Sequence, residues 1–221
     1  MRYIVPCLCL CLAFPAAAQE PAIEVFGGTA FNFRTPLEVR RTHSSDIKLI
    51  ARYETKPLEP PLYYSIRIGM RGRRHALEVQ FTHHKLFLAN TAGDLDHLEI
   101  SHGYNILTIN GALRLKHVDL RMGVGPVLAH VESVISAVAF GSPGYWHLTG
   151  PALLVGIGKS YSVTGRLFIA PEIQLIAARA HVPLGEVSFS QGSRGAINAP
   201  HVAVHVHVGF GILPLHRHPA D

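Results

Sequence analysis

Hydrophobic and polar residues alternate with a period of two along most of the chain, and helical spacing is absent. The segment HVAVHVHVGFG (residues 201–211) shows this well, with four valines and Phe210 on one face and three histidines with small residues on the other. Such alternation is typical of a strand whose two faces meet different environments. Comparable stretches predict about eight strands, at residues 23–33, 64–71, 77–82, 96–107, 118–134, 146–161, 165–180 and 201–212.

The lengths of the strands and of their connections point to a membrane protein. Several strands exceed the five or six residues common in soluble sheets. Short turns at 72–74 and 162–164 alternate with longer polar connections at 89–95, 136–144 and 183–198, while residues 47–54 belong to a long excursion. Outer-membrane barrels have an even number of strands, short turns at one end and long loops at the other. We therefore predict an all-β protein, an eight-stranded antiparallel transmembrane β-barrel, with aromatic residues 63, 64, 145, 146 and 161 near the membrane interfaces.

The direction in which each face points separates two interpretations. In a membrane barrel the valines face the acyl chains and the histidines face inward, whereas in a soluble exported barrel the apolar face points in. Alternation alone is compatible with both. The second face carries Gly, Arg, Glu, Gln and His, which favours a polar interior and hence the membrane. An open sheet would leave unpaired edges in hydrocarbon, so this interpretation also requires closure.

The N-terminal segment predicts export of the protein, and the overall charge limits the classes of partner. Arg2, an apolar run at 3–14 and three alanines at 16–18 predict a secretory signal peptide over residues 1–18. All three cysteines lie in that segment, so no disulfide is expected in the mature chain. We expect one barrel over residues 19–213 and a periplasmic tail over 214–221. The net charge of +5 is modest and not clustered, which argues against a nucleic-acid partner; a monomer in contact with outer-membrane lipid is expected.

The motif His130-Val131-Glu132 is a first candidate for chemistry. Spacing i, i+2 puts both polar side chains on one face of a strand, where they suit a divalent metal, an acid–base pair or an interior salt bridge. Upstream, residues 118–124 are apolar at even positions, but residues 127–131 are apolar at odd positions. We predict a β-bulge in the Gly/Pro-containing stretch 123–126 that reverses the parity and turns His130 and Glu132 inward.

Other polar residues could join such a site. Strict alternation turns His83 outward, which is costly in lipid unless the strand has left the bilayer or a bulge re-aims the side chain. Ser101 and His102 are neighbours on one strand and point to opposite faces, which makes them a weak hydrolase dyad. Glu172 and His201 project to the polar face. A set of two histidines and a carboxylate suits a divalent redox metal of unknown identity.

The order of short motifs resembles a known family. The motifs are PPLYYSIRIG, FTHHK, HGYNILTIN, GVGPVLAHVES, GYWHLTGPA, APEIQL and APHVAVHVHVGFG, and they extend over roughly residues 46–211. Together they resemble the outer-membrane β-barrel family that includes lipid A oxidase-like proteins. That resemblance implies an eight-stranded barrel with lipid A as its partner, and oxidation of the proximal glucosamine to 2-aminogluconate with oxygen. The segment HGYN departs from the Asp-Gly-Leu-Asn-like segment expected of the family.

The positions that match the family are His83, Lys85, Gly103, Asn105, His130, Glu132, Glu172 and His201. With His102 of the departing segment added, the catalytic candidates are His83, Lys85, His102, Asn105 and Glu172, and the metal candidates are His130, Glu132 and His201. Lys85 and nearby arginines are expected to hold lipid phosphates. Two alternatives stay open: a non-catalytic structural barrel, and a lipid A acyl-chain hydrolase that would need a serine, a histidine and an acid in one place.

Overall fold

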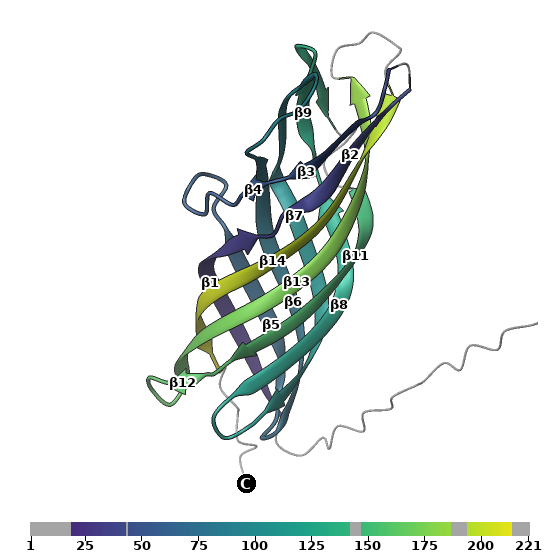
Figure 1. The fold of residues 1–221 in the computed structure, drawn as a ribbon. Helices are drawn as coiled ribbons and strands as arrows, with labels where there is room; N and C mark the ends of the chain where they lie inside the picture. The colour runs from purple at the N-terminus through teal and green to yellow at the C-terminus, as the bar shows by residue number, and fades with distance from the viewer. Residues whose placement is uncertain (1–18, 43, 142–146, 187–193, 214–221) are drawn as a thin grey trace, which may run out of the picture.

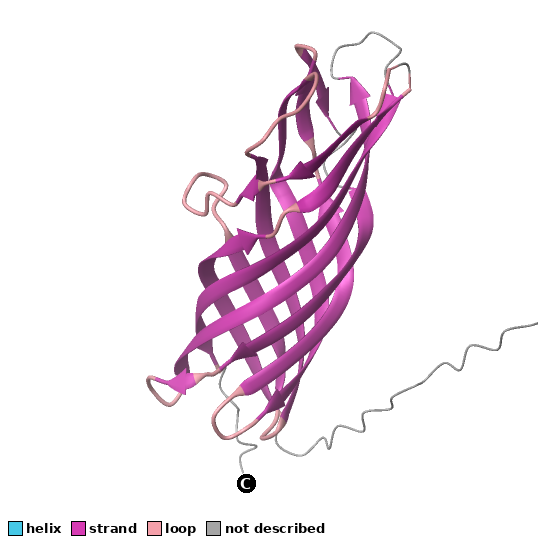
Figure 2. Cartoon of the chain, in the orientation of Figure 1, coloured by secondary structure: helices cyan, strands magenta, loops and turns pink. Residues whose placement is uncertain are grey.

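A computed structural model describes residues 19–42, 44–141, 147–186 and 194–213. In this part of the chain eight antiparallel strands form a closed ring, in which each strand pairs with the next and the last pairs with the first (Figures 1 and 2). The ring strands are β1 (Glu20–Asn32), β5 (Tyr64–Arg71), β6 (His75–Leu88), β7 (Leu95–Arg114), β8 (Asp119–Ala129), β11 (His147–Gly158), β13 (Leu167–Glu186) and β14 (Arg194–Ile212). The predicted eight-stranded antiparallel barrel is confirmed.

Shorter strands extend the ring at one end. They are β2 (Thr35–Arg41), β3 (Ile47–Ala51), β4 (Tyr53–Glu54), β9 (Glu132–Ile135) and β10 (Val138–Gly141), while β12 (Tyr161–Ser162) lies in a turn at the other end. β2 pairs with the upper part of β14, β9 with β7, and β10 with β13 (Figure 1). Short turns in outer-membrane barrels face the periplasm and long extensions face the exterior. The extended end is therefore extracellular, and the sequence had indicated only an excursion where β2 to β4 lie.

The outward face of the ring carries a continuous apolar belt. On β14, Val206, Val208 and Phe210 are exposed, at 37, 50 and 67%, whereas His205 and His207 are buried inside. The belt continues around the ring through Ile23, Val25, Ile66, Ile68, Leu77, Val79, Ile109, Met122, Val124, Leu153, Val155, Ile173 and Leu175. The predicted orientation, with valines outward and histidines inward, is confirmed. Within the described residues no helix is long and apolar enough to cross a membrane.

The chemistry of the interior changes with height. On β13 the buried face begins with Phe168 and Ala170 at the periplasmic end, continues with the polar Glu172 and Gln174, and then carries apolar residues from Ile176 to Leu184. The outward face changes in the opposite sense, from Leu175 to Arg179 and His181. Inside the membrane the outer surface must be apolar, so polar groups collect within. Above the membrane the outer surface meets water and headgroups, so the ordinary apolar core returns.

This change explains why the prediction of a β-bulge at residues 123–126 of β8 was wrong. Arg121, Gly123, Val127 and Ala129 share the buried face, so parity is kept through residues 123–126. The irregularity lies instead on the partner strand β11, between Leu148 and Gly150. The apolar positions switch from even to odd because the lipid-facing side gives way to the inner core, with no reversal of the strand. His130 and Glu132 consequently face outward.

The aromatic residues near strand ends lie on different sides of the barrel wall. Tyr64 and Tyr161 are on the outer surface, whereas Tyr63 is buried and its hydroxyl lies 2.6 Å from Nδ1 of His205. Residues 145 and 146 lie outside the described residues, as do the predicted signal peptide and the tail at 214–221. The belt therefore has an aromatic residue at each membrane interface, as predicted for a membrane barrel.

Candidate functional site

The residues singled out from the sequence fall on two sides of the barrel wall. His83, Asn105, His130 and Glu132 are on outward-facing positions of neighbouring strands at the extracellular end. Glu172 and His201 point into the interior and are buried. The side chain of His102 lies outside the described residues. The structure thus brings together most of the outward candidates and separates them from the two inward ones.

A bulge in β7 is the centre of the outward group. Against β6, His84 pairs with Tyr104 and Leu86 pairs with Ile100, so residues 101–103 of β7 stand opposite Lys85 alone. On the other side of β7, Tyr104 pairs with Ala129 and Glu99 with Glu132, which leaves His130 and Val131 beside the same bulge. Bulges are common next to functional sites because they re-aim side chains.

Gly103 makes this bulge possible. Its φ of +127° belongs to a region that side-chain-bearing residues rarely adopt, and a Cβ there would lie 2.1 Å from the amide of Asn105. The side chain of Asn105 occupies the space that a side chain at position 103 would need, and it accepts a hydrogen bond at 2.7 Å from Nδ1 of His83. The ring of Tyr64 stacks on His83, with centroids 5.2 Å apart. An outward histidine is therefore tolerated because it lies at the membrane boundary, hydrogen-bonded and covered.

This hydrogen bond also selects the tautomer of His83. An amide oxygen accepts, so Nδ1 carries the proton and Nε2 carries the lone pair of the neutral ring. Lys85 has a different role from the one expected. Its side chain is fully buried, and Nζ donates to the carbonyl oxygen of Glu59, 2.5 Å away, and lies 5.3 Å from the Phe87 ring centroid. Lys85 thereby fastens the loop between β4 and β5 to the barrel wall.

Beside the bulge, two identical motifs face outward on adjacent strands. Nε2 of His130 lies 3.6 Å from Oε1 of Glu132, and Nε2 of His97 lies 3.3 Å from Oε2 of Glu99. Glu99 and Glu132 are direct cross-strand partners. We call these four residues the twin His-x-Glu site. Sequence reasoning found only one half of it, although His97-Leu98-Glu99 repeats the spacing of His130-Val131-Glu132 and could have been noticed.

The twin His-x-Glu site is suited to proton transfer. Opposed residues on antiparallel strands have Cβ atoms about 5 Å apart, so two ionised carboxylates there repel each other. Each carboxylate has a histidine beside it, and a paired imidazole and carboxylate is a common arrangement for general acid–base chemistry. The side chains of Glu132 and His97 are 45 and 52% exposed, so a group approaching from outside can reach them.

Glu172 belongs instead to a buried ion network inside the membrane part of the barrel. Its Oε2 lies 2.8 Å from Nη2 of Arg67 and 2.6 Å from Nη1 of Arg121. The ion network joins Arg67, Arg71 and Arg121 to Glu24, Glu78 and Glu172. Glu172 is therefore a counter-charge within the barrel, remote from the outer surface.

His201 belongs to a cluster of ring side chains inside the barrel, at the extracellular end of the polar part of the interior. Its Nε2 lies 3.0 Å from Nε2 of His84, and its ring contacts Tyr104 edge-on. The barrel wall separates it from His130 and Glu132, so the three metal candidates are not assembled into one site. In the described part of the chain, no group of three or more His, Cys, Asp or Glu residues is arranged to hold a metal ion. We therefore derive no step through a metal.

Comparison with known proteins supports the fold. No protein-family model and no curated protein matches the chain. Among solved structures, the chain is similar to the outer membrane protein OprG from Pseudomonas aeruginosa, with 9% identity, a TM-score of 0.51, and coverage of 89% of this chain and 98% of that one. It is also similar to the outer membrane protein AlkL, solved in DMPC bilayers, with 10% identity, a TM-score of 0.52, and coverage of 94% and 98%.

At this level of identity the similarity shows the fold alone. The closed eight-stranded ring and the apolar belt define an integral β-barrel of the bacterial outer membrane. With its short turns in the periplasm, the barrel holds the twin His-x-Glu site on the side of the outer leaflet.

Proposed function

We propose that the protein binds and modifies the headgroup of lipid A at the twin His-x-Glu site. The observation that carries this proposal is the position of the site, which faces outward on the extracellular side of the barrel wall, above the apolar belt. A lipid in the outer leaflet brings its acyl chains against the belt, and its sugar headgroup lies on the extracellular side of the belt, as the site does. No passage through the barrel is needed for such a substrate.

The resemblance to lipid A oxidase-like proteins suggests the reaction. Removal of two electrons and two protons from the anomeric carbon of the proximal glucosamine and its hydroxyl gives the lactone, and oxygen accepts the two electrons and finally the two protons, becoming hydrogen peroxide. Water then opens the lactone to 2-aminogluconate, so the product is heavier than the glucosamine by one oxygen atom. In this proposal Glu99 and Glu132 take up the protons, and His97 and His130 orient the carboxylates. His83, held by Asn105 and covered by the Tyr64 ring, is buried in the neighbouring strand β6 and supports the barrel wall beside the site.

A purely structural role is the second candidate, and the filled interior favours it. The ion network fills the polar part of the interior, and its members Arg67, Glu78 and Glu172 are each at most 5% exposed. Above it lies an apolar core that includes Leu86, Ile106 and Val182. A barrel filled in this way offers no route for solutes, since eight strands leave room only for side chains.

Mass spectrometry of lipid A tests the proposal. Lipid A from cells that express the protein is compared with lipid A from cells that lack it, under aeration. We expect a species heavier by one oxygen atom, and we expect Glu132→Gln and Glu99→Gln to abolish it. Glu59→Gln is the matched control, because that side chain is 61% exposed, forms its ion pair with Lys56 and lies outside the twin His-x-Glu site. Identical spectra with and without the wild-type protein refute the enzymatic role and leave the structural one.

A further inference from the structure

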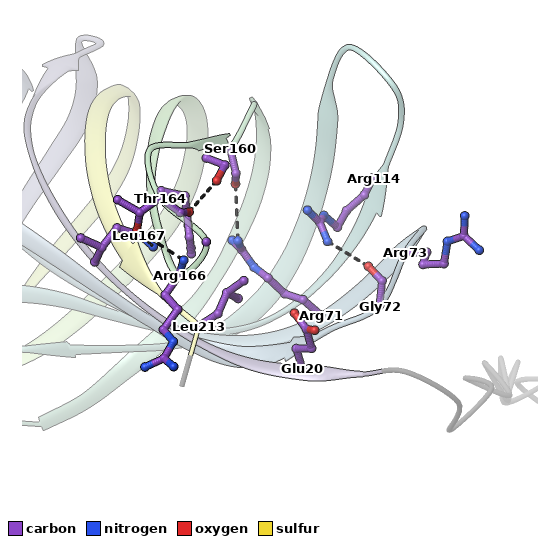
Figure 3. Close-up of a pocket in the computed structure, with 13 residues that line it drawn as sticks. Glu20, Arg71, Gly72, Arg73, Arg114, Ser160, Thr164, Arg166, Leu167 and Leu213 are labelled. Carbon is purple, nitrogen blue, oxygen red and sulfur yellow. Dashed lines mark hydrogen bonds between the residues drawn. The ribbon is translucent and has the colours of Figure 1, made fainter. Parts of the chain in front are cut away.

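A pocket of about 330 Å³ opens at the periplasmic end of the barrel, opposite the twin His-x-Glu site (Figure 3). The turns that follow β5 and β11 meet there, together with the end of β7 and the starts of β1 and β13. Pockets of roughly 300 Å³ and above accommodate small organic ligands. This pocket is therefore large enough for a phosphate group together with the residue that carries it.

The lining of the pocket is strongly basic. Four arginines contribute to it, Arg71, Arg73, Arg114 and Arg166, against Glu20 as the acid among the lining residues. Closely spaced positive charges at a concave surface concentrate anions there. Guanidinium groups are also well matched to phosphate, because their planar set of donors can form two parallel hydrogen bonds.

Two of these arginines are held in place before any ligand arrives. Arg71 is nearly buried, with Nη2 2.7 Å from Glu24 and its guanidinium carbon 4.6 Å from the Phe168 ring centroid, and its Nη1 reaches Oγ of Ser160 at 3.4 Å (Figure 3). Nη1 of Arg114 donates to the carbonyl oxygen of Gly72 at 2.9 Å. Such anchoring lowers the entropic cost of binding, since fewer side chains must be ordered.

The remaining lining combines hydroxyl groups with an apolar wall. Ser160, Ser162 and Thr164 contribute the hydroxyl groups, and Leu167, Phe168 and Leu213 contribute the apolar side chains. Leu167 is 46% exposed at the lower edge of the apolar belt. The pocket thus joins an anion-binding surface to an apolar one at the level of the inner leaflet.

From these features we propose that the pocket binds the phosphate group of an anionic phosphate ester on the periplasmic side. Arg114 and Arg166 contact the phosphate oxygens, and Arg71 adds its positive charge from the buried side of the pocket. The apolar side chains contact the organic part of the ester that adjoins the phosphate. Two sources offer this chemistry, namely the headgroup of an inner-leaflet phospholipid and a soluble periplasmic phosphate ester.

Two binding measurements on the purified, folded protein in maltoside micelles separate these sources. Calorimetric titration with glycerol 3-phosphate reports on a soluble ester, and native mass spectrometry after addition of phosphatidylglycerol reports on a lipid headgroup. Loss of one charge-assisted contact corresponds to about tenfold weaker binding. We expect Arg114→Gln and Arg166→Gln each to weaken binding by about that factor.

Lys116→Gln is the matched control, because it removes a positive charge from an exposed position at the same end without lining the pocket. Its affinity should equal that of the wild type. Arg166 lies in an exposed turn, so its variant is informative even if Arg114→Gln folds poorly. Binding of glycerol 3-phosphate identifies a soluble ester, and retention of phosphatidylglycerol alone identifies a headgroup. The proposal is overturned if neither binds, or if Arg166→Gln and Lys116→Gln bind equally well.

Discussion

Replacing Arg67 by methionine should be among the most destabilising single changes in the barrel. Arg67 is 1% exposed and lies at the centre of the ion network. Its guanidinium donates to Glu24 at 3.2 Å, to Glu172 at 2.8 Å, and to Oε1 of Gln80 at 3.0 and 2.9 Å. It also lies 4.6 Å from the centroid of the Phe26 ring. Methionine keeps much of the volume but removes the charge and every donor.

The magnitude follows from the balance of charge. The ion network holds three arginines and three glutamates, so Arg67→Met leaves one buried negative charge without compensation. Removing one partner of a buried ion pair costs about 3–5 kcal/mol. The second variant, Arg67→Met with Glu172→Gln, restores the balance and should recover part of this loss. A coupling free energy of at least about 1 kcal/mol between the two positions is expected.

Urea unfolding in lipid vesicles measures these free energies, with the gel mobility of the unheated protein as a check of folding. Arg67→Lys keeps the charge but not the planar set of donors, and its stability should fall between those of the wild type and Arg67→Met. If Arg67→Met costs less than about 1 kcal/mol, or if the double variant is simply additive, the ion network does not stabilise the barrel in the way described.

Three further predictions concern the bulge in β7, the membrane-facing surface of β14 and the extracellular strand β2. Gly103→Ala should cost about 1–3 kcal/mol, because its φ is +127° and its Cβ would displace Asn105, whereas Gly111→Ala, with nothing within 4 Å of its Cβ, should be neutral in the same unfolding assay. Val208→Lys should cost about 2–4 kcal/mol in vesicles, since Val208 faces the acyl chains, while Leu58→Lys in the extracellular loop, where Leu58 is 86% exposed, should be silent; equal effects would contradict the assigned orientation. Hydrogen bonds from Asn198, Arg40 and Lys48 lower the pKa of Glu38 from 4.5 to about 2, so its contribution to the β2–β14 contact is complete above pH 4.5 and is lost as the pH falls through about 2. An NMR titration of the Glu38 carboxyl group should give that midpoint, and Asn198→Ala should raise it.

The outward site shows how far sequence reasoning could reach. The spacing of His130 and Glu132 correctly placed both side chains on one face, and strict alternation correctly turned His83 outward. The side on which His130 and Glu132 lie was predicted wrongly, because the apolar face was assumed to be lipid-facing along the whole strand. The partner motif at His97 and Glu99 was visible in the sequence, but nothing local indicated that β7 and β9 place the two glutamates opposite each other.

The period-two pattern by itself determined that the chain forms strands, which residues share a face, and that the valines of β14 oppose its histidines. These properties are local, because successive side chains on any strand point to opposite sides. The tertiary structure alone decided the height at which the barrel leaves the membrane, the bulge at residues 101–103, and the separation of His201 from His130 and Glu132 by the barrel wall. Those properties depend on register between strands distant in sequence and on what surrounds each strand at a given depth, and neither is encoded in the alternation of a single segment.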